Sequence, residues 1–401
     1  MKLNKEKKNT NNNFFNRNPW ISLVIFNLFL SVLIFSSVEY ALRIFTPDWL
    51  ANRMIYLNPN AKSTIVEFSD NPLKEIQKKN EKNEFISFEP NSKINLSHYE
   101  YSNEFNMDKF GGRKVTSESN NDIDTLEKII FIGDSFTFGV GVEDNEVFCS
   151  LAQKDINPQI LNFGRPGSSL PRDINLIKLR LPDLIRKYKI NNIIFCWFLG
   201  NDAADILNFK KVRIENKDDL LNHDTDILTK LNKFVFYNRF LNKIYLIQYV
   251  RQKVMNIIKD EKNMDPVFHL FKNKKEYTNR FSKLTDNYLN ELNKISKEYN
   301  FKLTFLLIPD RYQINDKKRE LLKKQYNISP ELQIDYLMPN KLLTSLLIKN
   351  QIDFIDPIDC IKNESKQNND IYYIQDNHFT KKGHQLYYNC IKDKLLVNLK
   401  K

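Results

Sequence analysis

Five short apolar runs from residue 128 onward predict the strands of a sheet. Runs of this kind, apolar on both faces, rich in β-branched residues and separated by helix-length segments, are typical of a parallel sheet covered on both sides. We therefore expect an α/β fold, in which active sites form at the carboxyl ends of the strands. The runs are Lys128–Gly133, Gln159–Phe163, Asn192–Phe198, Lys302–Ile308 and Ile352–Asp356.

A longer apolar segment near the N-terminus predicts a membrane-spanning helix. Trp20 to Val38 contains no charged residue, and as a helix it spans roughly 28 Å, about the hydrocarbon thickness of a bilayer. A cleavable signal peptide is the alternative, but its apolar core is normally shorter and a small-x-small site follows it. Here Ser-Ser-Val-Glu-Tyr-Ala-Leu-Arg follows. A buried core helix would show a polar face, which this segment lacks. We expect an uncleaved signal anchor over residues 20–42.

The rest of the chain divides into a tether and one large domain. Residues 43–125 are polar and mixed, and we expect a tether and N-terminal extension there with short strands at most. Residues 126–398 form the domain. The third and fourth runs are about a hundred residues apart, more than one crossover helix needs. This spacing predicts a helical insertion at about 206–300.

Part of this insertion, Ile227–Ile258, mixes aromatic residues with Lys and Arg at helical spacing. It is either an amphipathic helix on the membrane or over the site, or a helix packing its aromatic face on the domain. We favour the packed helix.

The distribution of charge predicts a membrane topology and does not indicate a nucleic-acid partner. The net charge is +12, and residues 1–19 hold five basic residues against one acidic. Basic residues ahead of an apolar segment favour a cytoplasmic tail at 1–19, which places the domain in the periplasm or outside the cell. No compact basic stripe interleaved with stacking aromatics is present, so we expect a solvated basic surface, with contact to anionic lipid as the second interpretation.

The cysteines predict neither a zinc site nor a particular disulfide. None of the four lies in a CxxC pair, and an even number permits three pairings. Cys196 lies in an apolar run, which favours a buried free thiol. We assign no disulfide from the sequence. The four are Cys149, Cys196, Cys360 and Cys390.

Polar residues follow the first three runs where an active site is expected. Ser135, in GDSFTFG, stands at a strand-to-helix turn, where a hydroxyl and the amides of a new helix end suit a nucleophile and an oxyanion hole. An ordinary helix N-cap at Asp134 or Ser135 is the alternative. In NFGRPG a glycine leaves an amide free to donate, or simply makes a turn. Asn201, in LGND, can donate to an oxyanion or bond its own loop.

A serine nucleophile needs a base, and the C-terminal segment QDNHFTKKGH offers one. The serine needs a base with a pKa near neutrality, which a histidine such as His378 supplies, and Asp376 can orient its ring, although Asp-x-His also occurs by chance. Glycine usage favours the functional interpretation. Seven of the nine glycines lie in or beside these four segments, where a side chain would not fit.

In order, the four segments resemble the sequence blocks of the SGNH (GDSL-like) hydrolase superfamily. GDSFTFG resembles the nucleophile block, NFGRPG the glycine block, LGND the asparagine block and QDNHFTKKGH the Asp/His block. The resemblance covers roughly residues 105–395, including the lead-in FGGR and the stretch IPDRYQ at 308–313. The residues so identified are Ser135, Gly167 with Gly164 as second choice, Asn201, Asp376 and His378.

The resemblance implies a three-layer α/β/α sandwich with a five-stranded parallel sheet of flavodoxin-like order, and acyl-transfer chemistry. Ser135 would attack an ester carbonyl, His378 would take its proton and Asp376 would hold the ring. The Ser135 and Gly167 amides and the Asn201 side chain would hold the oxyanion. No metal or organic cofactor is implied.

One departure affects the assignment. Most secreted GDSL esterases carry Asp-x-x-His, whereas the Asp-x-His here resembles the branch containing alginate O-acetyltransferase-type and related membrane-tethered proteins, with Phe379 where that branch often has Trp. Beside the site, we expect His384 to be structural and Asp134 and Asp202 to cap and brace their turns.

These features predict a membrane-anchored acyl-ester hydrolase, an esterase or deacylase acting on envelope lipids or acylated glycans. The first alternative is an O-acyltransferase that passes an acetyl group to an extracytoplasmic polysaccharide, which admits a partner membrane protein. The second is a non-catalytic binding module, which is disfavoured because every catalytic residue type is present.

Overall fold

The computed structural model of the chain describes most of the domain and the apolar N-terminal segment. The basic tail, most of the tether and most of Ile227–Ile258 lie outside the described residues. Those residues are 18–45, 77–79, 85–97, 100–116, 127–214, 244–247, 249–250, 266–325, 333–366, 371–373 and 376–400.

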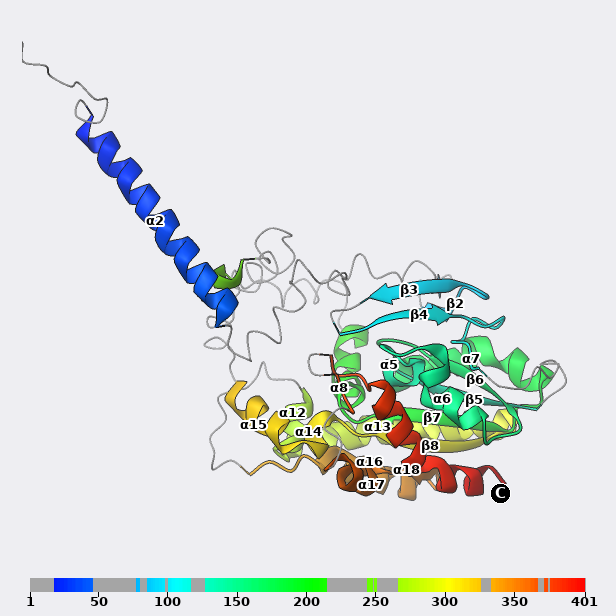
Figure 1. The fold of residues 1–401 in the computed structure, drawn as a ribbon. Helices are drawn as coiled ribbons and strands as arrows, with labels where there is room; N and C mark the ends of the chain where they lie inside the picture. The colour runs from blue at the N-terminus through cyan, green and yellow to red at the C-terminus, as the bar shows by residue number, and fades with distance from the viewer. Residues whose placement is uncertain are drawn as a thin grey trace, which may run out of the picture.

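A five-stranded parallel sheet forms the centre of the domain (Figure 1). The strand order is β6-β5-β7-β8-β9, so the first strand along the chain lies between the second and the third. This is the flavodoxin-like order, and the predicted α/β class and strand order are confirmed. The strands are β5 (Lys128–Gly133), β6 (Gln159–Gly164), β7 (Asn192–Phe198), β8 (Lys302–Ile308) and β9 (Asp353–Ile355).

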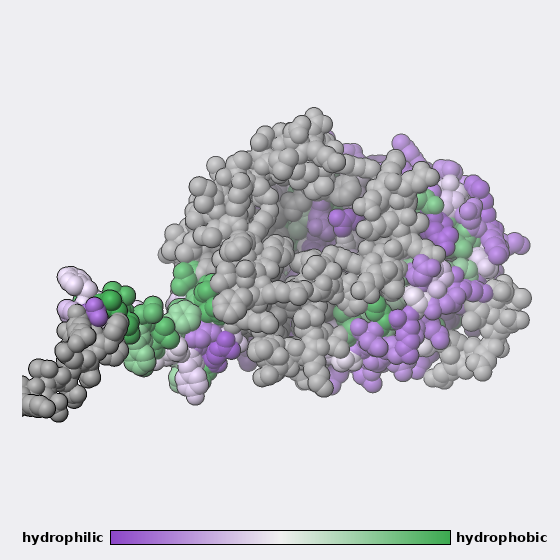
Figure 2. Space-filling model, turned by 90° about the horizontal axis from the view of Figure 1, so that it is seen from above, coloured by the Kyte–Doolittle hydropathy of each residue, from purple (hydrophilic) through white to green (hydrophobic). Residues whose placement is uncertain are grey.

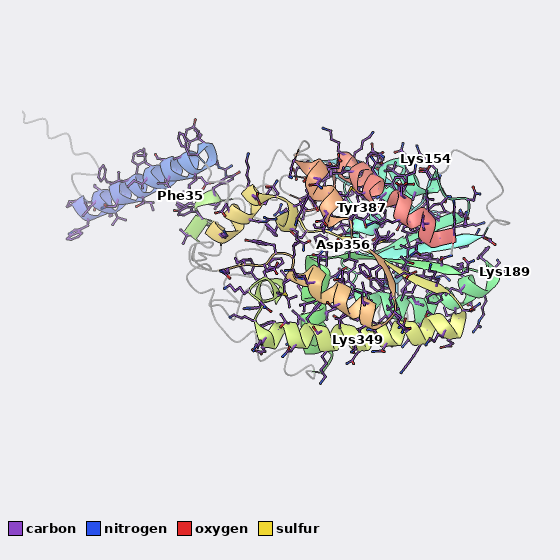
Figure 3. The ribbon with its side chains drawn as sticks, turned by 90° about the horizontal axis from the view of Figure 1, so that it is seen from below. Phe35, Lys154, Lys189, Lys349, Asp356 and Tyr387 are labelled. Atoms are coloured by element: carbon purple, nitrogen blue, oxygen red, sulfur yellow. A yellow bond between two sulfur atoms is a disulfide. The ribbon has the colours of Figure 1, made fainter. Side chains whose placement is uncertain are left out.

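Helices cover both faces of the sheet because its strands are apolar on both sides. Along β5, Ile130 and Ile132 pack into one hydrophobic cluster and Ile129 and Phe131 into the other. The view from below separates the two layers, with Lys349 on one side and Tyr387 on the other (Figure 3). The first layer holds α7 (Leu170–Lys187), α8 (Asn201–Ile214), α13 (Lys275–Tyr299) and α16 (Met338–Lys349), and the second holds α6 (Phe148–Gln153), α17 (Ile358–Ser365) and α18 (Lys381–Lys400).

Helix α13 shows how sequence periodicity sets this arrangement. Its buried residues recur every three or four positions, so one stripe faces the sheet. The helix lies within the range expected to be an insertion, and its stripe packs in the same cluster as β7 and β8. The buried positions are Thr278, Phe281, Thr285, Leu289, Leu292 and Ile295.

Shorter elements fill the connections and the N-terminal extension. The extension contains two antiparallel strand pairs, β1 with β2 and β3 with β4. Its apolar residues form a separate cluster with Phe138 and Val140, which follow the first strand of the main sheet. The remaining elements are β1 (Gln77–Lys79), β2 (Phe85–Phe88), β3 (Lys93–Ser97), β4 (Ser102–Asn106), α5 (Ser135–Phe138), η2 (Asp144–Glu146), α12 (Pro266–Phe271), α14 (Arg311–Ile314) and α15 (Asp316–Gln325).

Helix α2 (Pro19–Ile44) is long and apolar enough to cross a membrane, and none of its residues is buried. Its apolar side chains stand out from the rest of the molecule (Figure 2). Near its C-terminal end, Glu39 accepts hydrogen bonds from the backbone N–H groups of Tyr245 and Leu246, at 2.9 and 2.8 Å. This part of the predicted insertion therefore contacts α2.

The structure contains one disulfide among its described residues, which the sequence left unassigned. Cys360 in α17 is bonded to Cys390 in α18, with 5.7 Å between their Cα atoms. The bridge depends on two helices packing side by side, which the sequence pattern around each cysteine does not reveal. Cys149 and Cys196 are free and buried, as expected for Cys196.

Candidate active site

The candidate nucleophile begins a short helix after β5, the strand between β6 and β7. Asp134 caps this helix, since its side chain accepts a hydrogen bond from the Phe136 N–H at 2.9 Å. Phe136 and Phe138 are buried, whereas Ser135 is partly exposed. The turn therefore anchors its apolar residues in the core and leaves the serine hydroxyl accessible.

In the structure, hydrogen bonds connect Ser135 to His378 and His378 to Asp376. His378 Nε2 lies 2.7 Å from Ser135 Oγ. On the other side of the ring, His378 Nδ1 bonds to Asp376 Oδ1, which also accepts from the His378 backbone N–H at 2.9 Å. The serine and the histidine are 243 residues apart in the chain. In this arrangement Nε2 faces the hydroxyl and is available to take its proton.

The surroundings of His378 favour the protonated ring. Burial alone would lower the pKa of His378, but the negative charge and hydrogen bond of Asp376 outweigh it, with a smaller contribution from Asp134. The net result is a pKa raised above 6.5. His378 is therefore a stronger base than an ordinary histidine. Asp376 stabilises the positive charge that forms when His378 takes a proton.

Aromatic rings fix the orientation of the histidine. The Phe136 ring lies 5.2 Å from the His378 ring, centroid to centroid, and is itself stacked on Phe198 at 4.2 Å. Phe379 meets Phe136 edge-on at 5.0 Å. These contacts hold the ring in place.

Three candidate donors for an oxyanion come from the ends of adjacent strands. The Ser135 amide follows β5, Gly167 follows β6 and Asn201 begins α8 after β7. These three groups, the backbone amides of Ser135 and Gly167 and the side-chain amide of Asn201, donate no hydrogen bond within the part of the chain that the structure describes. Gly167 and Asn201 are exposed. All three donors are therefore available to a ligand.

Gly164, the second choice for the glycine block, is engaged elsewhere. Its N–H donates to Asn162 Oδ1 at 2.9 Å. A Cβ at this position would lie 2.2 Å from the Phe138 nitrogen, so the residue permits β6 to approach the nucleophile turn. The glycine has a packing role, and Gly167 is the better candidate donor.

A buried ion pair supports the turn that carries Gly167. Arg165 bonds to Asp173 Oδ1 at 2.7 Å and to Ser168 Oγ at 2.9 Å, and all three side chains are buried. The Arg165 N–H also donates to the Gly133 carbonyl at 2.9 Å, which joins this turn to the end of β5.

The neighbouring polar residues are structural, as expected. Asp202 accepts from the Phe198 N–H at 3.0 Å and braces the turn after β7. His384 Nδ1 accepts from the Phe148 N–H at 3.3 Å, and burial lowers the pKa of His384 to about 3. His384 is therefore neutral and does not compete with His378 as a base.

Sequence reasoning missed the residues that hold the site from the N-terminal extension. Arg113 is fully buried, pairs with Asp144 at 3.0 Å and donates to the carbonyls of Phe138 and Val142 at 3.0 and 2.6 Å. It therefore fixes the turn that follows the nucleophile helix. Tyr101 contacts Asp376 directly. The signal for Arg113 was its place after Gly111 and Gly112 in a glycine-poor chain, but Tyr101 had none.

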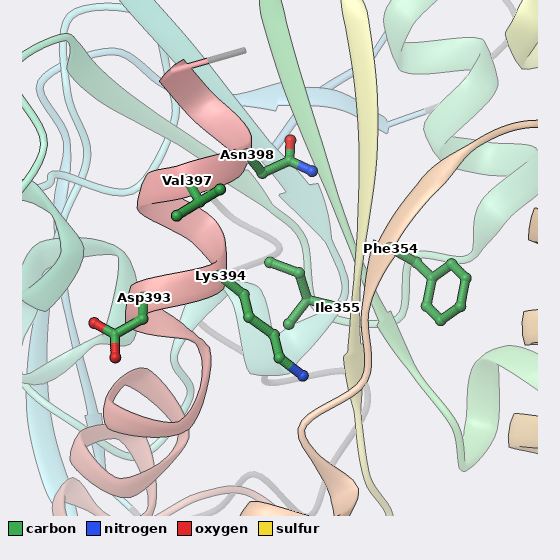
Figure 4. Close-up of a pocket in the computed structure, with 6 residues that line it drawn as sticks. All are labelled: Phe354, Ile355, Asp393, Lys394, Val397 and Asn398. Carbon is green, nitrogen blue, oxygen red and sulfur yellow. The ribbon is translucent and has the colours of Figure 1, made fainter.

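Within the described ranges, no group of three or more His, Cys, Asp or Glu side chains is placed to hold a metal ion. A groove of about 350 Å³ lies between β9 and α18, lined by Phe354, Ile355, Asp393, Lys394, Val397 and Asn398 (Figure 4). None of these six residues is a candidate site residue.

Comparison with known proteins finds likeness only among solved structures. No protein-family model matches the sequence, and no curated protein matches it significantly. Phospholipase A1 from Streptomyces albidoflavus NA297 is 10% identical, with a TM-score of 0.37 over 67% of this chain and 99% of that one. A lipase/acylhydrolase from Enterococcus faecalis is 12% identical, with a TM-score of 0.36 over 67% and 95%.

A lipolytic protein of the G-D-S-L family from Desulfitobacterium hafniense is 12% identical, with a TM-score of 0.33 over 66% of this chain and 96% of that chain. Of these three proteins, only the last is described as a member of the G-D-S-L family. At such low identities, we draw no conclusion about chemistry from the likeness.

Proposed function

We propose that this chain is a membrane-anchored serine hydrolase of the SGNH type that cleaves acyl esters outside the cytoplasm. The observation that carries the proposal is the series Ser135–His378–Asp376, with 2.7 Å between Oγ and Nε2. A nucleophile, a base and an orienting carboxylate within hydrogen-bond reach are the constellation for acyl transfer on several unrelated folds.

In the proposed reaction, Ser135 Oγ attacks the ester carbonyl carbon while His378 Nε2 takes its proton. The carbonyl oxygen becomes an oxyanion facing the Ser135 and Gly167 amides and the Asn201 side chain. The ester C–O bond then breaks, and His378 returns the proton to the leaving alcohol. Water then loses a proton to His378 and attacks the carbonyl carbon of the acyl-serine. The bond between the acyl group and Ser135 Oγ breaks, His378 returns the proton to Oγ, and the acid is released.

Two features support an extracytoplasmic domain. Basic residues precede α2, which favours a cytoplasmic N-terminus. The Cys360–Cys390 bridge belongs to an oxidising compartment such as the periplasm or the cell exterior.

The test uses the full chain in detergent with p-nitrophenyl acetate, with and without an acetyl-accepting oligosaccharide. We expect nitrophenol release and free acetate from the wild type and none from Ser135→Ala. Ser345→Ala, a matched change at an exposed serine of α16, should keep full activity. Acetyl found on the sugar would instead identify an O-acyltransferase using the same serine.

Activity that survives Ser135→Ala would show that the nucleophile is wrong. A fluorophosphonate probe, which reacts with an activated serine whatever the substrate, provides a second readout. A folded wild-type chain that neither labels nor hydrolyses would support a binding module.

A further inference from the structure

Asp376 contacts two residues of the N-terminal extension that lie outside all four sequence blocks. The Tyr101 hydroxyl donates to Asp376 Oδ2 at 2.9 Å. The Asp376 backbone N–H donates to Glu100 Oε2 at 2.8 Å. Tyr101 and Asp376 are 275 residues apart in the chain, and Glu100 and Tyr101 form the turn between β3 and β4.

The two oxygens of the Asp376 carboxylate have separate partners. Oδ1 serves His378, through both the backbone N–H and Nδ1. Oδ2 serves Tyr101. Rotation about the Cβ–Cγ bond moves both oxygens, so the bond from Tyr101 to Oδ2 adds a second restraint to those that His378 places on Oδ1. Tyr101 therefore locks the plane of the group that orients the histidine.

Packing fixes Tyr101 as firmly as its hydrogen bond does. Its side chain is buried among the apolar residues of the extension, in the cluster that contains Phe138 of the nucleophile helix. The ring lies 5.0 Å from the Tyr373 ring, centroid to centroid. Tyr373 in turn donates its hydroxyl to the Gly141 carbonyl at 2.6 Å and its backbone N–H to the His378 carbonyl at 3.1 Å.

Gly141 leaves the space beside the nucleophile turn that the rings of Tyr101 and Tyr373 need. Its φ is +92°, a conformation that favours glycine. A Cβ there would lie 2.7 Å from the Tyr373 ring and 3.2 Å from the Tyr101 ring. The two tyrosines therefore fit closely against the turn after the nucleophile helix as well as against the loop of Asp376 and His378.

We propose that Tyr101 is a positioning residue for the catalytic Asp376, so that the N-terminal extension completes the active site. The inference rests on the proposed serine-hydrolase function. Tyr101 acts through Asp376 and His378, and it touches neither Ser135 nor the ester in the proposed reaction. Loss of its hydroxyl should slow the chemical step and leave substrate binding unchanged.

The test compares Tyr101→Phe with Tyr388→Phe in the full chain in detergent. Tyr388 is a matched control because its buried side chain also donates to a carboxylate, Asp155 Oδ2 at 2.6 Å, and contacts no triad residue. Both changes keep the ring and remove one hydroxyl. We expect kcat for p-nitrophenyl acetate to fall about tenfold or more in Tyr101→Phe with KM unchanged, as for other groups that orient a catalytic residue from behind.

Labelling by a fluorophosphonate probe should slow by a similar factor, and it reports on the activated serine without a substrate. Tyr388→Phe should match the wild type in both readouts. Melting temperatures check that both variants are folded at the assay temperature. Tyr101→Phe removes a buried hydrogen bond and Tyr388→Phe a part-buried one.

The outcomes separate this inference from the proposed function. If Tyr101→Phe keeps wild-type kcat while Ser135→Ala is inactive, the positioning role is wrong and the proposed function stands. A loss shared equally by Tyr388→Phe would also overturn the positioning role, since any lost hydroxyl would then have the same effect. If the wild type neither hydrolyses the ester nor labels, the proposed function fails and this inference with it.

Discussion

Replacing Asp376 by Asn tests the electrostatic half of the proposed mechanism. The change keeps the size of the side chain and leaves an oxygen that can still accept from the His378 N–H. It removes the negative charge that faces Nδ1. In the proposed reaction His378 becomes positively charged as it takes the proton of Ser135, so the charge of Asp376 matters more in the transition state than in the resting enzyme.

The size of the effect follows from the contact between the two side chains. Opposite unit charges with centres about 4 Å apart attract by about 4 kcal/mol at an effective dielectric constant near 20. Each 1.4 kcal/mol corresponds to about a tenfold change in rate. We therefore expect kcat/KM of Asp376→Asn to fall about 1,000-fold, with a melting temperature close to that of the wild type.

The pH dependence of kcat/KM provides a second test of the role of Asp376. The neutral form of His378 is the base, so kcat/KM should rise with pH as the ring loses its proton. Because Asp376 raises the pKa of His378, the midpoint in the wild type should lie above 6.5. In Asp376→Asn only a small contribution from Asp134 opposes burial, and burial lowers this pKa, so the midpoint should move to lower pH.

The assay is nitrophenyl ester hydrolysis by the full chain in detergent between about pH 5 and pH 9. Asp393→Asn is the matched control, because Asp393 is an exposed carboxylate on α18 that lines the groove away from the triad. Its rate and pH profile should equal those of the wild type. A loss below about tenfold for Asp376→Asn, with an unmoved midpoint, would refute the assigned role of Asp376.

Two further predictions concern the oxyanion donors and the buried arginine. Asn201→Ala should lower kcat by about 100- to 1,000-fold with little change in KM, measured with the same ester, while Asn290→Ala on the exposed face of α13 should have no effect. An equal loss in both variants, or none in Asn201→Ala, would remove Asn201 from the oxyanion hole. Arg113→Met leaves Asp144 buried without its charge partner and should lower the free energy of unfolding by about 3–5 kcal/mol in denaturant titrations. Arg280→Met, at an exposed position of α13, should change the free energy of unfolding by less than about 0.5 kcal/mol. If Arg113→Met also changed it by so little, the stabilising role of the Arg113–Asp144 pair would be wrong.

The parallel sheet could be predicted because its strands carry their own signal. Three of the five apolar runs match the observed strands at both ends. Gln159–Phe163 differs from its strand by one residue at one end, and Ile352–Asp356 by one residue at each end. Strands buried on both faces need continuous apolar residues, so this pattern is local. The Cys360–Cys390 bridge could not be found in the same way, because it depends on the packing of α17 on α18.

The residues of the candidate site likewise differ in whether the local sequence predicts them. Ser135, Gly167 and Asn201 follow strands and sit beside glycines, so their positions could be read from the chain order. Glu100 and Tyr101 contact the site through a tertiary arrangement of the extension, where nothing in the polar sequence around them distinguishes a contact residue from a surface residue. Side chains that touch a substrate stand at predictable points of the fold, whereas those that orient them can come from anywhere.

The charges around the nucleophile turn give the proposed mechanism a further physical basis. Asp134, Asp173 and Asp202 are all buried there, and burial raises the pKa of each, that of Asp134 to about 7. Only Asp173 has a buried arginine against it, Arg165. Burial therefore favours the neutral form of Asp134 and Asp202, which keeps negative charge away from the strand ends where the oxyanion forms. When Asp134 is ionised, its charge adds to the raised pKa of His378. In the proposed reaction the positive charge forms on His378, and the negative charge forms on the carbonyl oxygen, which faces the amides at the strand ends. The arrangement therefore favours separating charge in the direction that serine attack requires.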